Sequence, residues 1–206
     1  MQALNFSTVD DSEELARAEV YGLLTSLFYA PPSAELYAQL RVAVTEAPTR
    51  GGFLEHSWGE LVGASRRTSL AEVSDEYTAL FLGLGKPEIF LYGSYYASGT
   101  LNGKSLVELR GDLRLLGLER VQAVTETEDH IASLCEVMRY LIAGDDVGVS
   151  NLAAQQRFYN AHLRNWIDLF FDALEAHPRA DFYGRVGAFA RDFFAVETQG
   201  LDLLDA

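Results

Sequence analysis

Cysteine is almost missing from this sequence, and its scarcity excludes a disulfide framework. Cys135 is the only cysteine among 206 residues, so the chain cannot form an internal disulfide bond and gives no sign of an oxidising compartment. The thiol lies among Ile131, Leu134 and Met138 at helical spacing. We therefore expect a buried cysteine that takes no part in chemistry.

Long apolar runs are also missing. No stretch approaches the roughly 18 consecutive apolar residues that a transmembrane helix needs. Residues 1–10 lack the basic start and the apolar core of a secretory signal. We therefore expect a cytoplasmic protein that does not insert into a membrane.

Positive charge is scarce. The chain has 16 basic and 30 acidic residues, which gives a net charge of -14. Such a field repels nucleic acid and anionic membranes and attracts cationic partners. Solubility alone is an equally acceptable reason for the charge. An apolar content of 49% and an aromatic content of 12% are typical of a packed globular protein.

The strong signatures of catalysis and cofactor binding are absent. The sequence has no Gly-x-Ser-x-Gly, no His-Glu-x-x-His and no paired Cys-x-x-Cys. Residues 83–87 (Gly-Leu-Gly-Lys-Pro) lack the upstream glycine and the Ser or Thr of a phosphate-binding loop. We predict a protein that is not an enzyme, with no catalytic residue, no metal and no cofactor.

One enzymatic alternative stays open. Glu126 and His130 are four residues apart, which would place them on one face of a helix, and Asp129 lies beside them. His162 would approach from another helix. These four side chains would form the centre of a helical metal-dependent hydrolase, although their spacing matches no strong metal signature.

Alternating strand patterns are missing too, and helical periodicity fills most of the chain. We predict an all-α protein, a single helical bundle domain over residues 1–206 with about eight helices and a hinge loop at 144–150. The expected helices cover residues 11–29, from Ser33 to before Pro48, around 53–62, 69–82, 105–116, 126–143, 150–177 and 180–197. Residues 86–102 are expected to form a long functional loop. Three capping boxes are predicted at helix starts: Asp11 with Glu14, Ser69 with Glu72, and Thr125 with Glu128. Ser105 and Glu108 are expected to start a further helix.

Two clusters stand out as candidate binding elements. The first is the aromatic run Tyr92-Gly93-Ser94-Tyr95-Tyr96, and the second is the acidic run Glu126-Thr127-Glu128-Asp129-His130, expected in the first turn of a helix. Tyrosine rings give contact area at low entropic cost, and carboxylates pair with arginine or lysine. Together the clusters suit an extended, partly basic peptide. Taken singly, the tyrosines are more often packing residues and His130 more often a structural one.

The two clusters resemble the paired motifs of the TorD/DmsD/NarJ chaperones, the redox enzyme maturation proteins. The resemblance lies in Tyr92-x-Ser94-x-Tyr96, followed about thirty residues later by Glu126-x-x-Asp129-His130. It extends in outline over residues 13–195. Three positions depart from the pattern: Leu91 stands where proline is common, Gly93 where an acidic residue is common, and Ser133 where glutamate often follows.

The resemblance implies a cytoplasmic all-α chaperone of a molybdenum enzyme. Such a protein binds the catalytic subunit of its client, often at the twin-arginine signal peptide, and keeps it open for cofactor insertion. It implies a monomer or a homodimer. By the family's motif, the expected client-binding residues are Tyr92, Ser94, Tyr96, Glu126, Asp129 and His130. Alanine at Asp129 and His130 is expected to weaken client binding and to leave the fold intact.

Overall fold

The computed structural model describes residues 9–45, 52–83, 85–101, 103–121 and 125–205, and the regular elements in these ranges are helical. The all-α prediction is confirmed. The helices are α1 (Val9–Tyr29), α2 (Ala34–Val42), η1 (Gly52–Leu54), α3 (Glu55–Arg67), α4 (Leu70–Tyr77), η2 (Thr78–Leu82), α5 (Gly93–Ser98), α6 (Lys104–Leu115), α7 (Ile131–Ala143), α8 (Leu152–His162), α9 (Ile167–Glu175), α10 (Phe182–Asp202) and η3 (Leu203–Asp205).

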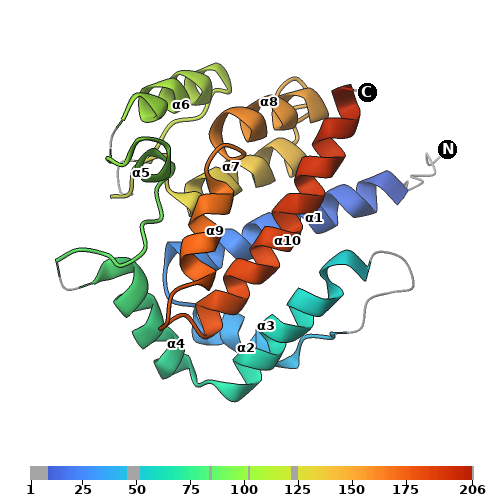
Figure 1. The fold of residues 1–206 in the computed structure, drawn as a ribbon. Coiled ribbons are helices and arrows are strands. Elements are labelled where there is room, and N and C mark those ends of the chain that lie inside the picture. Colours follow the sequence, from blue (N-terminus) through green and yellow to red (C-terminus); the bar gives the residue numbers. More distant parts are fainter. Residues whose placement is uncertain (1–8, 46–51, 84, 102, 122–124, 206) are drawn as a thin grey trace.

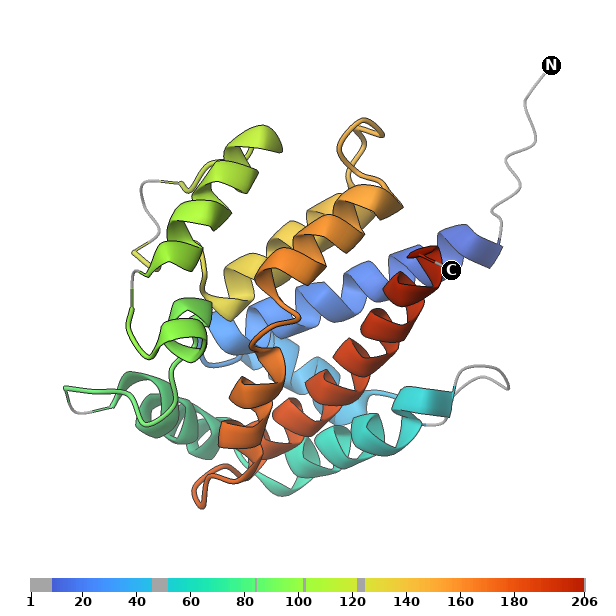
Figure 2. The ribbon, with the colours of Figure 1, turned by 45° about the horizontal axis from the view of Figure 1, so that its top comes forward.

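Helix α1 runs through the middle of the molecule, and the other helices pack around it (Figure 1). It lies along α7, while α10 packs on α3 and α9. Turning the molecule shows α2, α3 and α4 at one end, with α5, α6 and α8 at the other (Figure 2). Because α1 and α7 pack along each other, they form the frame on which the candidate site is built.

Aromatic side chains fill the interior. Tyr21, Phe28, Phe170 and Phe194 are fully buried and meet their neighbours mostly edge to face, the geometry that aromatic rings prefer. Cys135 is also completely buried, and burial raises the pKa of its thiol. The prediction of a buried cysteine is confirmed.

A network of polar hydrogen bonds joins α1, α8 and α10 across this apolar interior. The Arg17 guanidinium (α1) donates to both carboxylate oxygens of Glu197 (α10), at 2.6 and 2.8 Å, and to Gln155 (α8) at 3.1 Å. The Tyr21 hydroxyl donates to the same carboxylate at 3.0 Å. Each buried polar group is therefore paired, as a buried charge requires.

The described residues hold ten α-helices rather than about eight, for two reasons. The expected loop 86–102 contains the short helix α5, and the expected helix 150–177 divides into α8 and α9. At the division, the Trp166 indole Nε1 donates to the His162 carbonyl at 2.6 Å, while the Trp166 backbone N–H turns to the Leu163 carbonyl. The indole thus takes the acceptor that a continuous helix would have offered to the backbone N–H of Trp166.

Two of the predicted helix starts are confirmed. The capping box of Ser69 and Glu72 is present at α4, and Ser33 caps α2. However, α2 already ends at Val42.

Two other predicted starts are wrong, and a third is off by one residue. Asp11 lies inside α1, and its side chain is outside the described residues. Helix α6 begins at Lys104 after Gly103, without a side-chain cap, so Ser105 does not cap it. Thr125 does not begin a helix either, because α7 starts only at Ile131.

Residues 144–150 connect α7 to α8 through a turn in which the backbone N–H groups of Val149 and Ser150 donate to the Asp146 carbonyl. A hinge at this position stays a prediction. Among the helices that the structure describes, none combines the length and the apolarity that a membrane crossing requires.

Candidate functional site

The two sequence clusters lie side by side, held by backbone hydrogen bonds. Tyr92 and His130 form an isolated antiparallel bridge. The Gly93 N–H donates to the Asp129 carbonyl at 3.0 Å, and the Ile131 N–H donates to the Leu91 carbonyl at 2.8 Å. The structure therefore joins the start of α5 to the start of α7 at this point.

The carboxylate of Asp129 accepts a backbone N–H group. It accepts the Ser94 N–H at 2.9 Å, in the first turn of α5, and the Thr127 hydroxyl at 2.6 Å. The residue is 4% exposed. Asp129 thus caps α5 from a distant part of the chain, which is the role that a carboxylate plays at a helix N-terminus. Alanine here would leave a buried N–H without its acceptor, so we expect the substitution to lower the free energy of unfolding.

His130 is the N-cap of α7. Its Nδ1 accepts the Ala132 N–H at 3.2 Å, so Nδ1 carries no proton. The ring is 3% exposed and meets the rings of Tyr29 and Tyr92 edge-on. Burial lowers the pKa of His130 from 6.5 to about 4, in spite of the nearby carboxylates of Glu126 and Asp129. The imidazole is neutral at physiological pH.

Since His130 occupies the N-cap, the expected capping box of Thr125 and Glu128 is wrong. Glu126, Glu128 and Asp129 precede α7 instead of lying in its first turn, which contains no acidic residue. Glu128 pairs with Arg110 of α6 at 2.9 Å.

Tyr92 and Glu126 are half-buried, as is Tyr96. The Tyr92 hydroxyl donates to Glu126 Oε2. Burial raises the pKa of Tyr92, and the carboxylate of Glu126 raises it further. This pair lies nearer to solvent than Asp129 and His130, so a partner reaches it first.

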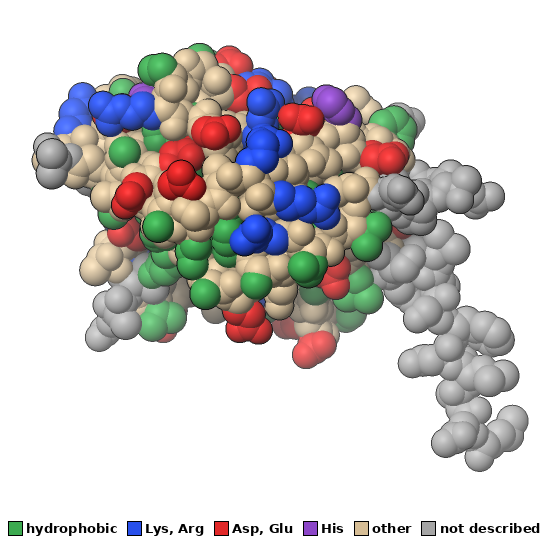
Figure 3. All heavy atoms as spheres, turned by 90° about the horizontal axis from the view of Figure 1, so that it is seen from below, with side chains coloured by type: hydrophobic (Ala, Val, Ile, Leu, Met, Phe, Trp, Pro, Cys, Tyr) green, Lys and Arg blue, Asp and Glu red, His purple; other side chains and the backbone are tan. Residues whose placement is uncertain are grey.

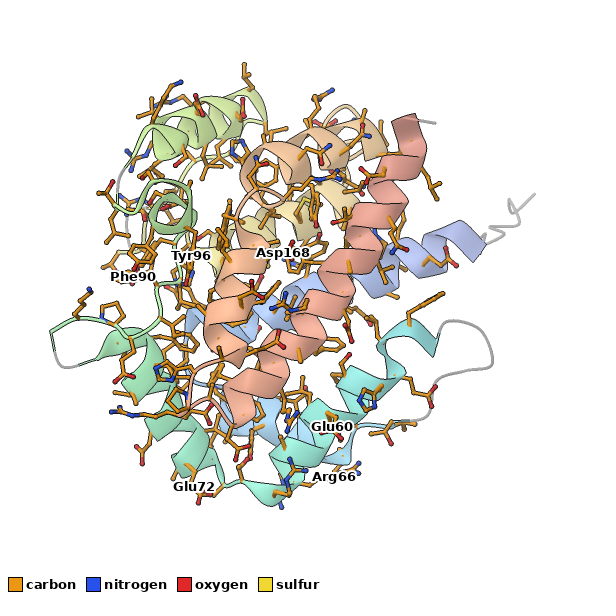
Figure 4. The ribbon with its side chains drawn as sticks, in the orientation of Figure 1. Glu60, Arg66, Glu72, Phe90, Tyr96 and Asp168 are labelled. Carbon is orange, nitrogen blue, oxygen red and sulfur yellow. The ribbon has the colours of Figure 1, made fainter. Side chains whose placement is uncertain are left out.

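Tyr96 and Ser94 turn toward the interior. The Tyr96 hydroxyl donates to the Phe90 carbonyl at 3.0 Å, and its ring stacks on Trp166 with centroids 5.7 Å apart. Figure 4 shows Phe90 and Tyr96 close together beside α9. The Ser94 hydroxyl is buried and has no hydrogen-bond partner among the described residues. Both side chains act here as packing residues.

Gly93, one of the departures from the family pattern, has a steric cause. A Cβ at this position would lie 2.8 Å from Nε1 of Trp166. The close approach of α5 to the indole therefore requires glycine.

The alternative metal centre does not assemble. His162 Nε2 is 2.7 Å from Asp112 Oδ2 on α6, while Asp129 and His130 bind backbone N–H groups. Within the described ranges, no three His, Cys, Asp or Glu side chains lie close enough together to hold a metal ion.

A groove lies next to the motifs, and it was not predicted from the sequence. It is a hollow of about 470 Å³ between the end of α1, residues 118–121 after α6, and one face of α7. Its apolar lining includes Tyr29, Leu113, Leu118, Val121, Val137 and Tyr140, and three carboxylates also line it: Glu119, Glu128 and Glu136. The helical spacing of Ser133, Val137 and Tyr140 was the available signal, since these residues share one side of α7.

The face formed by α2, α3 and α4 carries charges of both signs. Seen from below, it shows basic side chains across its middle with acidic ones among them, and hydrophobic side chains along one edge (Figure 3). Arg41, Arg66 and Arg67 are exposed on these helices, and so are Glu35, Glu55, Glu72 and Asp75. The charge of these helices therefore does not keep a cationic partner away from this face.

Comparison with known proteins agrees with the motifs. Residues 49–172 match the family model described as "Nitrate reductase delta subunit". The chaperone protein TorD of Vibrio cholerae serotype O1 (strain M66-2) is 30% identical, with 92% of each chain covered, and that of Colwellia psychrerythraea is 25% identical over 92% of this chain and 93% of its own.

The fold is similar to a crystal structure from Archaeoglobus fulgidus that is described as a redox enzyme maturation protein. The TM-score is 0.56 at 18% identity, over 93% of this chain and 98% of that one. The family model, which carries the name of the nitrate reductase delta subunit, covers more than half of the sequence. A curated TorD chaperone is 30% identical over nearly all of it. The chain therefore belongs to the TorD/NarJ family.

Proposed function

We propose that this protein is a cytoplasmic chaperone dedicated to one molybdenum oxidoreductase. It binds the catalytic subunit before cofactor insertion, at the twin-arginine leader peptide where the client has one, and holds it back from export or assembly until the cofactor is in place. Family membership and the TorD relatives, which are named as chaperones, support this role. In this function the protein makes and breaks no covalent bond.

The proposal rests on the groove between α1 and α7. A twin-arginine leader presents two guanidinium groups followed by an apolar stretch, and it needs carboxylates next to an apolar surface. The groove offers both, since Glu119 and Glu136 line it together with Tyr29 and Tyr140. Glu136 also pairs with Arg139 at 2.5 Å. Glu119 makes no ion pair within the described part of the chain. A charge-assisted hydrogen bond contributes about 1.5–3 kcal/mol when shielded and far less when exposed, so the apolar contact sets the affinity and the charges set the orientation.

The motif residues divide into two roles in this proposal. Ser94, Asp129 and His130 are buried. Asp129 caps the first turn of α5 at the Ser94 N–H, and His130 caps α7, whose first turn forms a wall of the groove. Tyr92 and Glu126 are half-buried and contact the client directly.

Truncating an aromatic ring of the groove tests the proposal. Tyr29 is 50% exposed and ends α1, so Tyr29→Ala is expected to leave the fold intact. Loss of an aromatic contact at an interface costs about 1–2 kcal/mol, which weakens binding of a twin-arginine leader peptide roughly five- to thirtyfold. Isothermal titration calorimetry measures the change.

The matched control is Leu169→Ala on α9, which is 53% exposed and does not line the groove. It is expected to bind the peptide like the wild type. Equal affinities of the two variants would reject the groove as the binding surface.

A further inference from the structure

A guanidinium group already lies in the wall of the groove, and it belongs to the protein itself. Arg120 follows α6 and donates through NH1 to the backbone carbonyls of Glu126 and Thr125, at 3.2 and 3.5 Å. Its Nε is 3.8 Å from Oε1 of Glu128. One carboxylate oxygen and two carbonyl oxygens therefore converge on a single planar cation.

The carboxylate in this set is held from its other side. Arg110 donates through Nε and NH2 to Oε2 of Glu128, at 3.0 and 2.9 Å. Glu128 is mostly buried, with its side chain 13% exposed. Arg110 thus fixes the carboxylate, and Oε1 stays directed toward Arg120.

The two arginines differ in how closely they approach Glu128. The contacts of Arg110 have the lengths of good charge-assisted hydrogen bonds, whereas the 3.8 Å between Arg120 Nε and Glu128 Oε1 is too long for a direct hydrogen bond. The Arg120 side chain is 38% exposed. Arg110 therefore fixes Glu128, and the contact of Glu128 with the partly exposed Arg120 is the weaker of its two ion pairs.

We propose that Glu128 Oε1 and the carbonyl oxygens of Thr125 and Glu126 form a guanidinium-binding site, which Arg120 fills at rest and which an arginine of the bound polypeptide takes over by displacing it. The site lies at the groove, since Arg120 and Glu128 both line it. The planar fork of an arginine matches several acceptors at once, while an ammonium group is a point charge with a stronger hydration shell. The site therefore selects arginine over lysine.

The site can be tested without any client. Argininamide is titrated into ¹⁵N-labelled Arg120→Ala protein, and the amide resonances of residues 125–128 are followed. We expect saturable shifts that are larger than in the wild type and absent with lysinamide. Missing shifts, or equal shifts with lysinamide, would overturn the assignment.

The displacement is tested with peptides and rests on the proposed function. Arg120→Ala is expected to bind a twin-arginine leader peptide about two- to fivefold more tightly than the wild type, because an exposed ion pair no longer has to be broken. A peptide with two alanines in place of the arginines should gain nothing. Arg120→Gln, which keeps a donor and loses the charge, should fall between the two proteins.

Arg185→Ala is the matched control, because it removes the same charge and a similarly loose ion pair, 3.7 Å from Glu60, outside the groove. It should bind like the wild type. Unchanged or weaker binding of the twin-arginine peptide by Arg120→Ala would reject the displacement. If the wild type binds no leader peptide, the proposed function fails, while the argininamide titration still decides on the guanidinium site.

Discussion

His130 joins two constraints in one ring. Its Nδ1 accepts the first free N–H of α7, and its burial between Tyr29 and Tyr92 opposes a positive charge. The acceptor role and the protonated state exclude each other, because a protonated Nδ1 cannot accept a hydrogen bond. Acid therefore acts on the start of α7 through this residue.

Replacing His130 tests this coupling. Burial holds its pKa at about 4 in the folded protein, against 6.5 in the unfolded chain. Between these values the unfolded chain binds the proton and the folded one does not, so the free energy of unfolding falls as the pH drops from 6.5 to 4. The total loss is about 3 kcal/mol, and above pH 6.5 there is none.

In His130→Asn, asparagine still offers a cap acceptor but does not titrate. We expect the free energy of unfolding, measured by urea denaturation at pH 7 and pH 4.5, to fall by less in this variant than in the wild type. Glu126 and Asp129, which face the ring, are present in both proteins. His56→Asn controls for the loss of a histidine. Equal pH dependence of the His130→Asn variant and the wild type would contradict the assignment.

At this scale the sequence identified the residues but not their surroundings. The motifs identified Tyr92, Glu126 and His130 as neighbours, and the structure places them together. Their burial depends on rings such as Tyr29, which comes from a part of the chain about a hundred residues away. Helical periodicity carries no information about such contacts, so the role of His130 as a helix cap could not be predicted.

Helix α10 shows a similar dependence between elements. Its own N-cap residue, Asp181, makes no side-chain cap. Instead Glu76 of α4 accepts the N–H groups of Asp181, Phe182 and Tyr183, at 2.9, 3.1 and 2.8 Å. One carboxylate thus satisfies three of the free donors at the start of this helix.

Glu76→Ala is therefore expected to lower the free energy of unfolding by about 1–2 kcal/mol, the usual cost of a lost cap. Glu76→Gln should recover part of this loss, because it keeps an acceptor. Urea denaturation followed by circular dichroism measures both. Asp75→Ala is the control. Asp75 is the neighbour of Glu76, and its carboxylate is exposed and makes no hydrogen bond or ion pair within the described residues. A loss of the same size in the control would disprove the cap.

Elements were predicted well where the signal is local. The capping box at Ser69 and the cap at Ser33 lie within four residues of the helices that they start. The cap of α10 and the break at Trp166 depend on side chains that reach across a turn or across the molecule. For this reason the helical content was predictable, and the number of helices was not.

At the scale of the whole molecule, the groove exists only in the folded protein. Its walls come from α1, from residues 113–121 and from α7. No single segment contains the pattern, although each contributes ordinary amphipathic spacing. The net charge of -14 could be read from the sequence, but the grouping of the charges on each face could not, because each face is assembled from several helices.

The proposed function depends on the client occupying the groove between α1 and α7. The most direct measurement is a titration of a synthetic peptide, two adjacent arginines followed by an apolar stretch, into ¹⁵N-labelled wild-type protein. We predict saturable shifts of the amide resonances of residues 118–121 and 132–140, with the α2–α4 face unchanged. Shifts confined to that lower face, or no shifts at all, would contradict the account.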